Sequence, residues 1–377
     1  MALSWDWSGW ERFPAGLTPA WTDDYEVPFL ANGGLGATLR SNGEPAVFAS
    51  GPNHSAFRTH FSFDDGTYHD WEELQGGLKT DTVSACLLGP IILAARSMEN
   101  NRVYWKFQDW GPTPDLPPWY PPREYFEDAP SWLEVEGGFL TDTGVAVTSV
   151  PYLFARNAST GEVWFTGASP SGAADWSGRW SVVPASGFVT EYAGPVGGPA
   201  PSMRTAVAPA VNAESFGPNS RVLIVVVQAG TDLLYWNALE FASDLSSLGW
   251  TGWTPIEGDL PFASDEQAKT LRPASLEKFR TDVSPCVVDN VVFAVGRDND
   301  IYSNALEPAG ATWDHQRPTS YTWTGWQRIG GLQTKQPVAG VRGWSQADGK
   351  PAPGYQTTYW LYAQGLDDYL YFNTAVL

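Results

Sequence analysis

The chain has 377 residues, more than the roughly 250–300 at which one hydrophobic core usually stops growing, so it either divides into domains or repeats a small unit. Its 38 glycines and 30 prolines exclude a helix-rich fold, and its 20 tryptophans, 15 tyrosines and 18 phenylalanines favour half-buried strands. The net charge of -20 at pH 7 opposes binding to nucleic acid and to anionic membranes, because both are negatively charged.

Several other classes of protein are disfavoured as well. No apolar stretch is long enough for a transmembrane helix, and the N-terminal residues lack the basic segment and apolar run of a secretory signal, so we expect a cytoplasmic location. The two cysteines, Cys86 and Cys286, and the four histidines have no metal-ligand spacing. Phosphate-loop and dinucleotide motifs are missing too, so we expect neither a metal nor a cofactor.

A short strand from Trp7 to Trp10 is the first predicted element. It resembles the outer strand of a repeat, but it comes before any inner strand. A tryptophan followed closely by a small or glycine-containing turn then recurs along the chain, and it predicts an outer strand in each repeat. These tryptophans are Trp10, Trp71, Trp132, Trp180, Trp253 and Trp326.

An inner strand rich in small residues is predicted to open each repeat. In chain order these segments begin near Trp21, Lys79, Leu140, Arg204, Arg280 and Gln333. Small side chains suit a position where neighbouring repeats converge. Each inner strand is followed by a hairpin whose second strand carries an aromatic residue. The hairpins run from Val47 to Phe57, Ile92 to Tyr104, Leu153 to Trp164, Val225 to Tyr235, Val292 to Tyr302 and Trp360 to Tyr371.

Four strands per repeat and six repeats predict an all-β, six-bladed β-propeller that forms a single domain over residues 1–377. The sixth repeat ends after its third strand, so we expect the N-terminal strand to complete the last blade and to remove the free sheet edges. Two long insertions, Phe188 to Met203 and Asp259 to Phe279, are predicted lids over the axis. A third, Asp109 to Pro130, is predicted to mediate a homodimer.

The segments Trp323-Thr-Gly-Trp326 and Phe293 to Tyr302 resemble the fucose-specific-lectin superfamily, which includes the bacterial PLL-type propeller lectins. The resemblance implies sugar sites between neighbouring blades, each built from an arginine, a carboxylate and an aromatic residue. Arg96, Arg156 and Arg297 follow the second strands, but only Arg156, Glu162 and Trp164 form a complete local trio. We therefore keep a fucose- or galactose-binding lectin, with glycan as partner, as the alternative function.

The dissimilarity of the blades favours one specialised pocket at the propeller axis, because selection for avidity would keep the copies alike. The chain resembles the fungal hetero-Diels–Alderase branch of this superfamily, which acts in tropolone-sesquiterpenoid biosynthesis. That resemblance implies a cofactor-free cyclisation or cycloaddition of a small apolar or aromatic substrate in an aromatic pocket. This is the function that we favour from the sequence.

Candidate residues for that pocket stand at the inner-strand openings and the hairpin turns. The expected catalytic donors are Arg204, Arg280, Lys79 and His54. The expected substrate-binding residues are Arg96, Arg156, Thr205, Thr281, Asp282 and Tyr25. Glycoside hydrolysis by a ring of Asp23, Asp81, Asp142 and Asp282 is a weaker hypothesis, since an aspartate beside a threonine commonly caps a turn.

Overall fold

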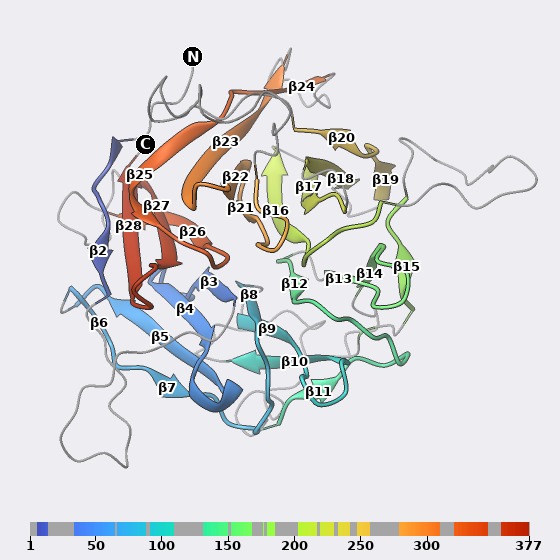
Figure 1. Ribbon diagram of the computed structural model, residues 1–377, viewed down its shortest axis with the longest axis horizontal. Coiled ribbons are helices and arrows are strands. Elements are labelled where there is room, and N and C mark those ends of the chain that lie inside the picture. The colour runs from blue at the N-terminus through green and yellow to red at the C-terminus, as the bar shows by residue number, and fades with distance from the viewer. Residues whose placement is uncertain are drawn as a thin grey trace, which may run out of the picture.

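A computed structural model gives the arrangement of the chain as a ring of sheets around a central axis (Figure 1). It describes residues 6–13, 34–64, 66–87, 91–108, 131–149, 152–167, 176, 179–184, 203–216, 219–229, 233–241, 247–256, 279–309, 320–345 and 356–376. Tyr25 and the three long insertions lie outside these residues, apart from their ends at Met203 and Phe279.

The innermost strand of each blade lines the axis. In order around the ring these strands are β3 (Leu35–Leu39), β8 (Val83–Leu87), β12 (Val145–Val147), β16 (Ala210–Phe216), β21 (Cys286–Val288) and β26 (Ala339–Ser345). The small residues expected here are present in blades two to six, whereas the inner strand of blade one is β3, and the segment predicted for it near Trp21 lies outside the described residues. Gly36 of β3 shows why small residues are needed, because a Cβ at that position would lie 2.4 Å from the Val83 carbonyl oxygen on the next blade.

The second strands of the blades form the most buried layer. They are β4 (Pro45–Ser50), β9 (Ile91–Arg96), β13 (Tyr152–Arg156), β17 (Asn219–Val227), β22 (Val291–Val295) and β27 (Gln356–Gln364). The third strands follow through tight hairpins and are β5 (Ala56–Ser62), β10 (Val103–Gln108), β14 (Val163–Gly167), β18 (Leu234–Phe241), β23 (Asp300–Ala309) and β28 (Leu370–Val376). The single helical turn among the described residues is the 3-10 segment η1 (Pro52–His54).

The outer layer consists of short strands. They are β6 (Thr67–Tyr68), β7 (Glu72–Glu73), β11 (Leu133–Glu134), β15 (Ser181–Val182), β19 (Ser247–Trp250), β20 (Thr254–Pro255), β24 (Ser320–Trp323), β25 (Gln327–Gln333), β1 (Asp6–Trp7) and β2 (Glu11–Arg12). Each repeat tryptophan stands directly before one of them.

Hydrogen-bonded pairing within each sheet is antiparallel and confirms the six-bladed propeller. Blades one to five comprise β3–β7, β8–β11, β12–β15, β16–β20 and β21–β25, and blade six comprises β26–β28 with β1 and β2. The N-terminal strands therefore complete the last blade, as predicted: Trp7 pairs with Ala375, and Arg12 pairs with Tyr371.

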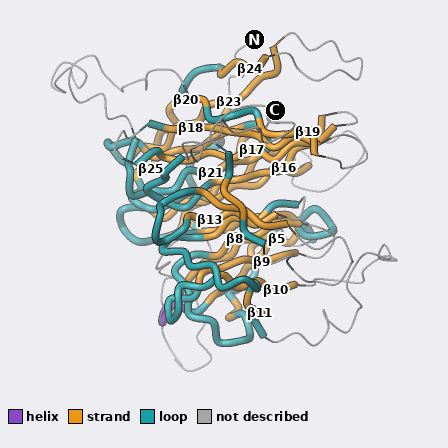
Figure 2. Tube along the Cα trace, turned by 90° about the vertical axis from the view of Figure 1, so that its right-hand side faces the viewer, coloured by secondary structure: helices purple, strands orange, loops and turns teal. Residues whose placement is uncertain are grey.

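The apolar core lies between the blades. Each of the six clusters of buried side chains joins two neighbouring blades, and each contains one repeat tryptophan, which packs back onto the preceding blade. Trp326 of blade five, for example, packs with Phe279 and with residues of blade four. A side view shows the strands stacked in this ring, with loops at both ends (Figure 2). Within the described ranges, no helix has the length and hydrophobicity to cross a membrane.

Candidate functional site

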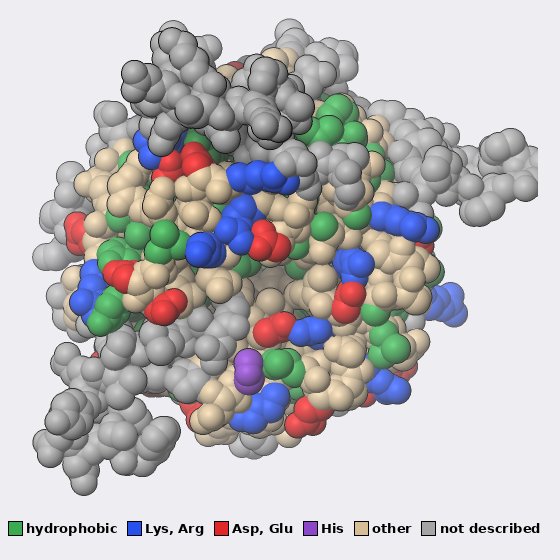
Figure 3. Space-filling model, viewed as in Figure 1, with side chains coloured by type: hydrophobic (Ala, Val, Ile, Leu, Met, Phe, Trp, Pro, Cys, Tyr) green, Lys and Arg blue, Asp and Glu red, His purple; other side chains and the backbone are tan. Residues whose placement is uncertain are grey.

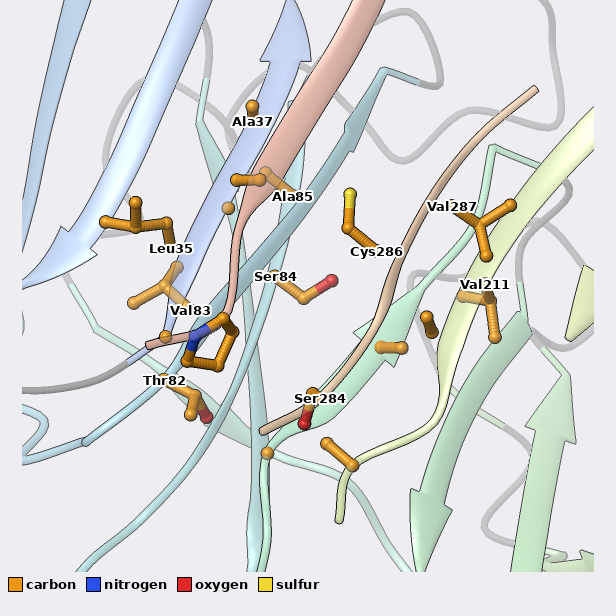
Figure 4. A pocket seen from close by; sticks show the side chains of 18 of the residues that line it. Leu35, Ala37, Thr82, Val83, Ser84, Ala85, Val211, Ser284, Cys286 and Val287 are labelled. Atoms are coloured by element: carbon orange, nitrogen blue, oxygen red, sulfur yellow. The ribbon is translucent and has the colours of Figure 1, made fainter. Parts of the chain in front are cut away.

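The axis holds a cavity of about 130 Å³ that is lined by all six inner strands (Figure 4). Its described lining consists of glycine, alanine, valine, leucine, proline, serine, threonine and cysteine, for example Ala85, Ser284 and Val211. The aromatic lining that we expected is not found in this part of the chain. The reason is steric: inner strands that approach one another this closely leave room only for small side chains, and the aromatic rings lie between the blades instead.

Charged side chains of both signs surround the hollow at the centre of one face (Figure 3). Several of the predicted site residues form ion pairs with one another. Arg96 pairs with Asp81, Arg156 pairs with Asp142, and Arg280 pairs with Asp282. The hydrogen bond from Arg280 lowers the pKa of Asp282, which keeps that carboxyl group ionised. Each of these three aspartates is thus paired with an arginine.

The threonine of the inner-strand motif has a structural role in four blades. Thr80, Thr141, Thr205 and Thr334 are buried, and each hydroxyl donates to the carbonyl oxygen two residues later. This turn places the motif before the inner strand rather than within it, since β8 begins only at Val83. Thr281 is half-buried in the corresponding turn of blade five. Thr205 is therefore a turn residue, with no hydroxyl proton left for a substrate.

Of the remaining predicted donors, Lys79 and His54 lie on hydrogen-bonded neighbouring segments, whereas Arg204 lies between blades three and four. Lys79 donates from Nζ to the Ser55 hydroxyl at 3.0 Å. His54, the residue before Ser55, has a left-handed backbone conformation. Arg204 is exposed beside Glu162, with which it forms a backbone bridge between blades three and four. Among the described residues, the structure brings no three of the expected catalytic donors to one point.

The lectin-like trio at Arg156 is also arranged differently from the expectation. The Trp164 indole donates to Glu162 at 3.4 Å, but the Arg156 guanidinium donates to the Thr205 carbonyl at 2.8 Å and pairs with Asp142. Arg156 thus joins the turns that precede the inner strands of blades three and four.

A larger cleft lies between blades five and six. Its volume is about 440 Å³, and its lining residues are Asp300, Arg328, Gly331, Leu332, Gln333, Leu366, Asp367 and Tyr371. Blade five supplies the first five of these residues, and the hairpin of blade six supplies the last three. Ligand pockets commonly have volumes of roughly 300–1,000 Å³, so this cleft has the size of a binding site and the axial cavity does not.

An ion pair forms one wall of this cleft. Arg328 of β25 donates from Nε to the buried carboxylate of Asp300, the first residue of β23, at 2.6 Å. Burial and the charge of Asp298 raise the pKa of Asp300, and the hydrogen bond from Arg328 opposes that rise without cancelling it. The Arg328 side chain is itself one-third exposed (34%), which leaves guanidinium donors facing solvent.

The opposite wall is the blade-six hairpin. The Tyr371 hydroxyl donates to Asp367 at 2.6 Å, and Leu366, at the tip of the turn, is 48% exposed. Leu332 of blade five approaches the same turn, because a Cβ on Gly365 would lie 3.3 Å from Leu332 Cδ1. The cleft therefore combines an ion pair, a carboxylate, an aromatic ring and two leucines.

The positions of Asp300 in the third strand and of Arg328 in the outer strand hold other residues in the other blades. The position of Asp300 is taken by Ser55, Arg102, Glu162, Leu233 and Tyr369, and the position of Arg328 by Glu73, Glu134, Val182, Pro255 and Arg12. Blade two has the reversed ion pair, Arg102 with Glu134, and in blade six Arg12 stacks on the Tyr369 ring. The site is thus specific to one junction of the ring.

Asp300, Arg328 and Tyr371 were not among the predicted site residues, because the arginines considered were those that follow the second strands or open the inner-strand motifs. The available signal was Arg328, two residues after the repeat tryptophan Trp326, where only the N-terminal strand has another arginine. Pairing the outer and third strands would have placed Arg328 opposite Tyr302, two residues from Asp300 and therefore on the same face of the sheet.

Comparison with known protein families and with curated proteins finds no match. Among solved structures, a lectin from Aleuria aurantia in complex with Fucα1-6GlcNAc is 11% identical with a TM-score of 0.47, over 91% of this chain and 92% of that chain. The lectin BP39L from Burkholderia pseudomallei is 15% identical with a TM-score of 0.43, over 93% and 97%. A putative gluconolactonase is 12% identical with a TM-score of 0.44, over 97% and 98%. These values are too low to assign a family or a function.

Proposed function

We propose that this protein binds carbohydrate in the cleft between blades five and six. The observation that carries the proposal is the juxtaposition of the Arg328–Asp300 ion pair with the exposed face of the Tyr371 hairpin across a cavity of about 440 Å³. A sugar ring presents hydroxyl groups at its edge and C–H groups on its faces. It therefore needs polar groups fixed in place on one side and an apolar surface on the other.

The ion pair suits the hydroxyl edge. A guanidinium donates several hydrogen bonds in a fixed plane, and a carboxylate accepts them, so two neighbouring hydroxyl groups can each find a partner. Asp300 is buried and held by Arg328, which means that the pair is ordered before the ligand arrives. Preorganisation of this kind reduces the entropy lost on binding.

The apolar wall suits the face of the ring. Tyr371 and the leucines Leu332 and Leu366 line the cleft, and all three are partly exposed. An aromatic ring held at its hydroxyl by Asp367 offers a flat surface at low cost in side-chain entropy. The absence of the same residue set at the equivalent positions of the other described blades argues for one site per chain rather than for multivalent binding.

The test is binding of a glycan panel by wild-type protein and by Arg328→Lys, followed by calorimetry on the best ligand. Lysine keeps the charge next to Asp300 but loses the planar fork, so we expect affinity to fall by about tenfold or more with little change in folding. The matched control is Arg102→Lys, which alters the reversed ion pair at the equivalent position of blade two and is expected to bind as wild type. Equal binding by all three proteins, or no binding of any glycan, would refute the proposal.

An axial cycloaddition site is the second hypothesis, and it has weaker support among the described residues. The axial cavity of about 130 Å³ lies below the roughly 300–1,000 Å³ of common ligand pockets, which leaves little room for two organic reactants. That hypothesis depends on the proposed lids over the axis, which lie outside the described residues. Arg280→Ala separates the two: it would abolish turnover at the axis and leave glycan affinity within about twofold of wild type, because Arg280 is not among the residues that line the cleft.

A further inference from the structure

The charges that line the cleft do not cancel. Arg328 is the only cationic side chain in the described lining, and its charge is neutralised by Asp300. Asp367 is exposed, and its hydrogen-bond partners are the Tyr371 hydroxyl at 2.6 Å and the Tyr369 backbone N–H at 3.3 Å, both uncharged. The lining therefore has one carboxylate in excess.

Asp367 also has acceptor capacity to spare. A carboxylate offers about four lone-pair positions, and the two contacts above use one position on each oxygen. The hydrogen bond from Tyr371 fixes the carboxylate at the rim of the cleft, next to the face of an aromatic ring. A carboxylate and a tyrosine ring side by side both attract a cation.

The field of the whole molecule acts in the same direction. A chain with a net charge of -20 attracts cationic ligands and repels anionic ones over distances of about a Debye length. Saccharides with carboxylate, sulfate or phosphate groups would meet both the excess carboxylate and this field. Saccharides with a protonated amine would be favoured by both.

We propose that the cleft selects amino sugars, with Asp367 as the acceptor for the ligand's ammonium group. The inference rests on the proposed function and specifies its ligand class: glucosamine-type saccharides whose amine is free rather than acetylated. The Arg328–Asp300 pair binds hydroxyl groups, and Tyr371 and the leucines contact the ring, so Asp367 decides only between charged and neutral forms of the same sugar.

The experiment compares short β-1,4-linked oligomers of glucosamine with N-acetylated oligomers of the same length, by calorimetry at low and at high salt. For wild type we expect the amine form to bind about fivefold more tightly at low salt, the advantage of one partly exposed ion pair. The advantage is expected to shrink at high salt because salt screens it.

Two variants assign the effect to one carboxylate. Asp367→Asn removes the charge but keeps an acceptor for Tyr371, and we expect it to abolish the preference. Asp368→Asn removes the same charge from the adjacent exposed residue, which does not line the cleft, and we expect it to keep the preference. For each protein we take the ratio of its affinities for the two oligomers and compare that ratio with the wild-type ratio. The steric effect of the acetyl group is the same in every ratio, so it does not affect the comparison.

The outcomes separate the two proposals. Suppose that the oligomers, or neutral glycans, bind in a manner that depends on Arg328. If the amine then gives no advantage, or if Asp367→Asn keeps the advantage, the amino-sugar inference is wrong and the binding site stands. If no saccharide binds, both are wrong. Tighter binding of the acetylated oligomer to wild type would also overturn the inference.

Discussion

Arg328 Nε lies 2.6 Å from a carboxylate oxygen of Asp300, and this contact joins the outer strand of blade five to the start of its third strand at the mouth of the interblade cleft. Asp300 is buried in the wall of the cleft, where it lines the cavity beside the more exposed Arg328. It is the feature that distinguishes this junction from the equivalent positions described in the other blades.

Glycan binding should weaken as the pH falls. Burial and the charge of Asp298 raise the pKa of Asp300, so this carboxyl group takes up a proton at a higher pH than an exposed aspartate does. Protonation weakens the pair with Arg328 and removes an acceptor for sugar hydroxyls. We expect the affinity measured by calorimetry to decline as pH falls, and Asp300→Asn to be weak and independent of pH in the same range. An affinity that stays constant until the protein unfolds would contradict this.

Closure of the ring should depend on Asn373. This buried side chain accepts hydrogen bonds from the Gly9 backbone N–H at 3.1 Å and from the Ser8 hydroxyl at 3.2 Å, which ties the N-terminal strands to β28. Asn373→Ala leaves the Gly9 N–H without this acceptor, and we expect a loss of about 1–3 kcal/mol in the free energy of unfolding. Hydrogen exchange should rise first in residues 6–13.

Asn304→Ala is the comparison for that experiment. Asn304 accepts from Gly325 N–H at 3.0 Å in blade five, where all strands are contiguous in the chain. A similar loss of stability is expected, without selective exchange in residues 6–13. Identical exchange patterns in the two variants would show that Asn373 has no special role in closure.

The close approach of the inner strands predicts a cost for any side chain at Gly36. A Cβ there would lie 2.4 Å from the Val83 carbonyl oxygen, which is backbone and can move only with its strand. We expect Gly36→Ala to lower the free energy of unfolding by about 1–3 kcal/mol in urea titrations. Gly330→Ala is the control, because no atom lies within 4 Å of a Cβ at that position. Equal stability of the two variants would show that the inner strands have room to spread.

Blade one should lose stability as the pH falls. The His60 and His69 rings stack with centroids 4.3 Å apart, and burial, with Arg40 and His69 nearby, lowers the pKa of His60 from 6.5 to about 4. The folded state therefore disfavours the protonated form of His60. Its contribution to stability is complete above pH 6.5 and is lost as the pH falls from 6.5 towards about 4.

Unfolding in urea across that range, for wild type and for His60→Gln, measures the effect. His60 is one of several groups in the protein that exchange protons as the pH falls, so the variant is expected to reduce the slope of stability against pH rather than to remove it. His54→Gln serves as the control, since His54 lies in η1 and not in the stacked pair. A slope that His60→Gln leaves unchanged would refute the prediction.

The architecture was predictable because it is encoded in repeated local patterns. A tryptophan before each outer strand, a hairpin with an aromatic in its second strand and a run of small residues recur six times. The boundaries were less accurate: the threonine motif was assigned to the inner strands, yet Thr80 and its equivalents form turns that precede them.

The site was not predictable in the same way. Arg328 and Tyr371 belong to different blades, and only the packing of blade five against blade six brings them to one cleft. Composition also misled the prediction at the axis. The many aromatic residues suggested an aromatic axial pocket, but rings such as Trp326 need the wider space between blades, and the converging inner strands admit residues such as Ala85 and Gly340.

A crystal structure of the protein with a bound saccharide chosen from the glycan panel tests the proposed site most directly. We expect a sugar between blades five and six, with hydroxyl groups within hydrogen-bond distance of Arg328 and Asp300 and one face of the ring against Tyr371. A sugar bound at the axis, or at another junction with this cleft empty, would contradict that expectation.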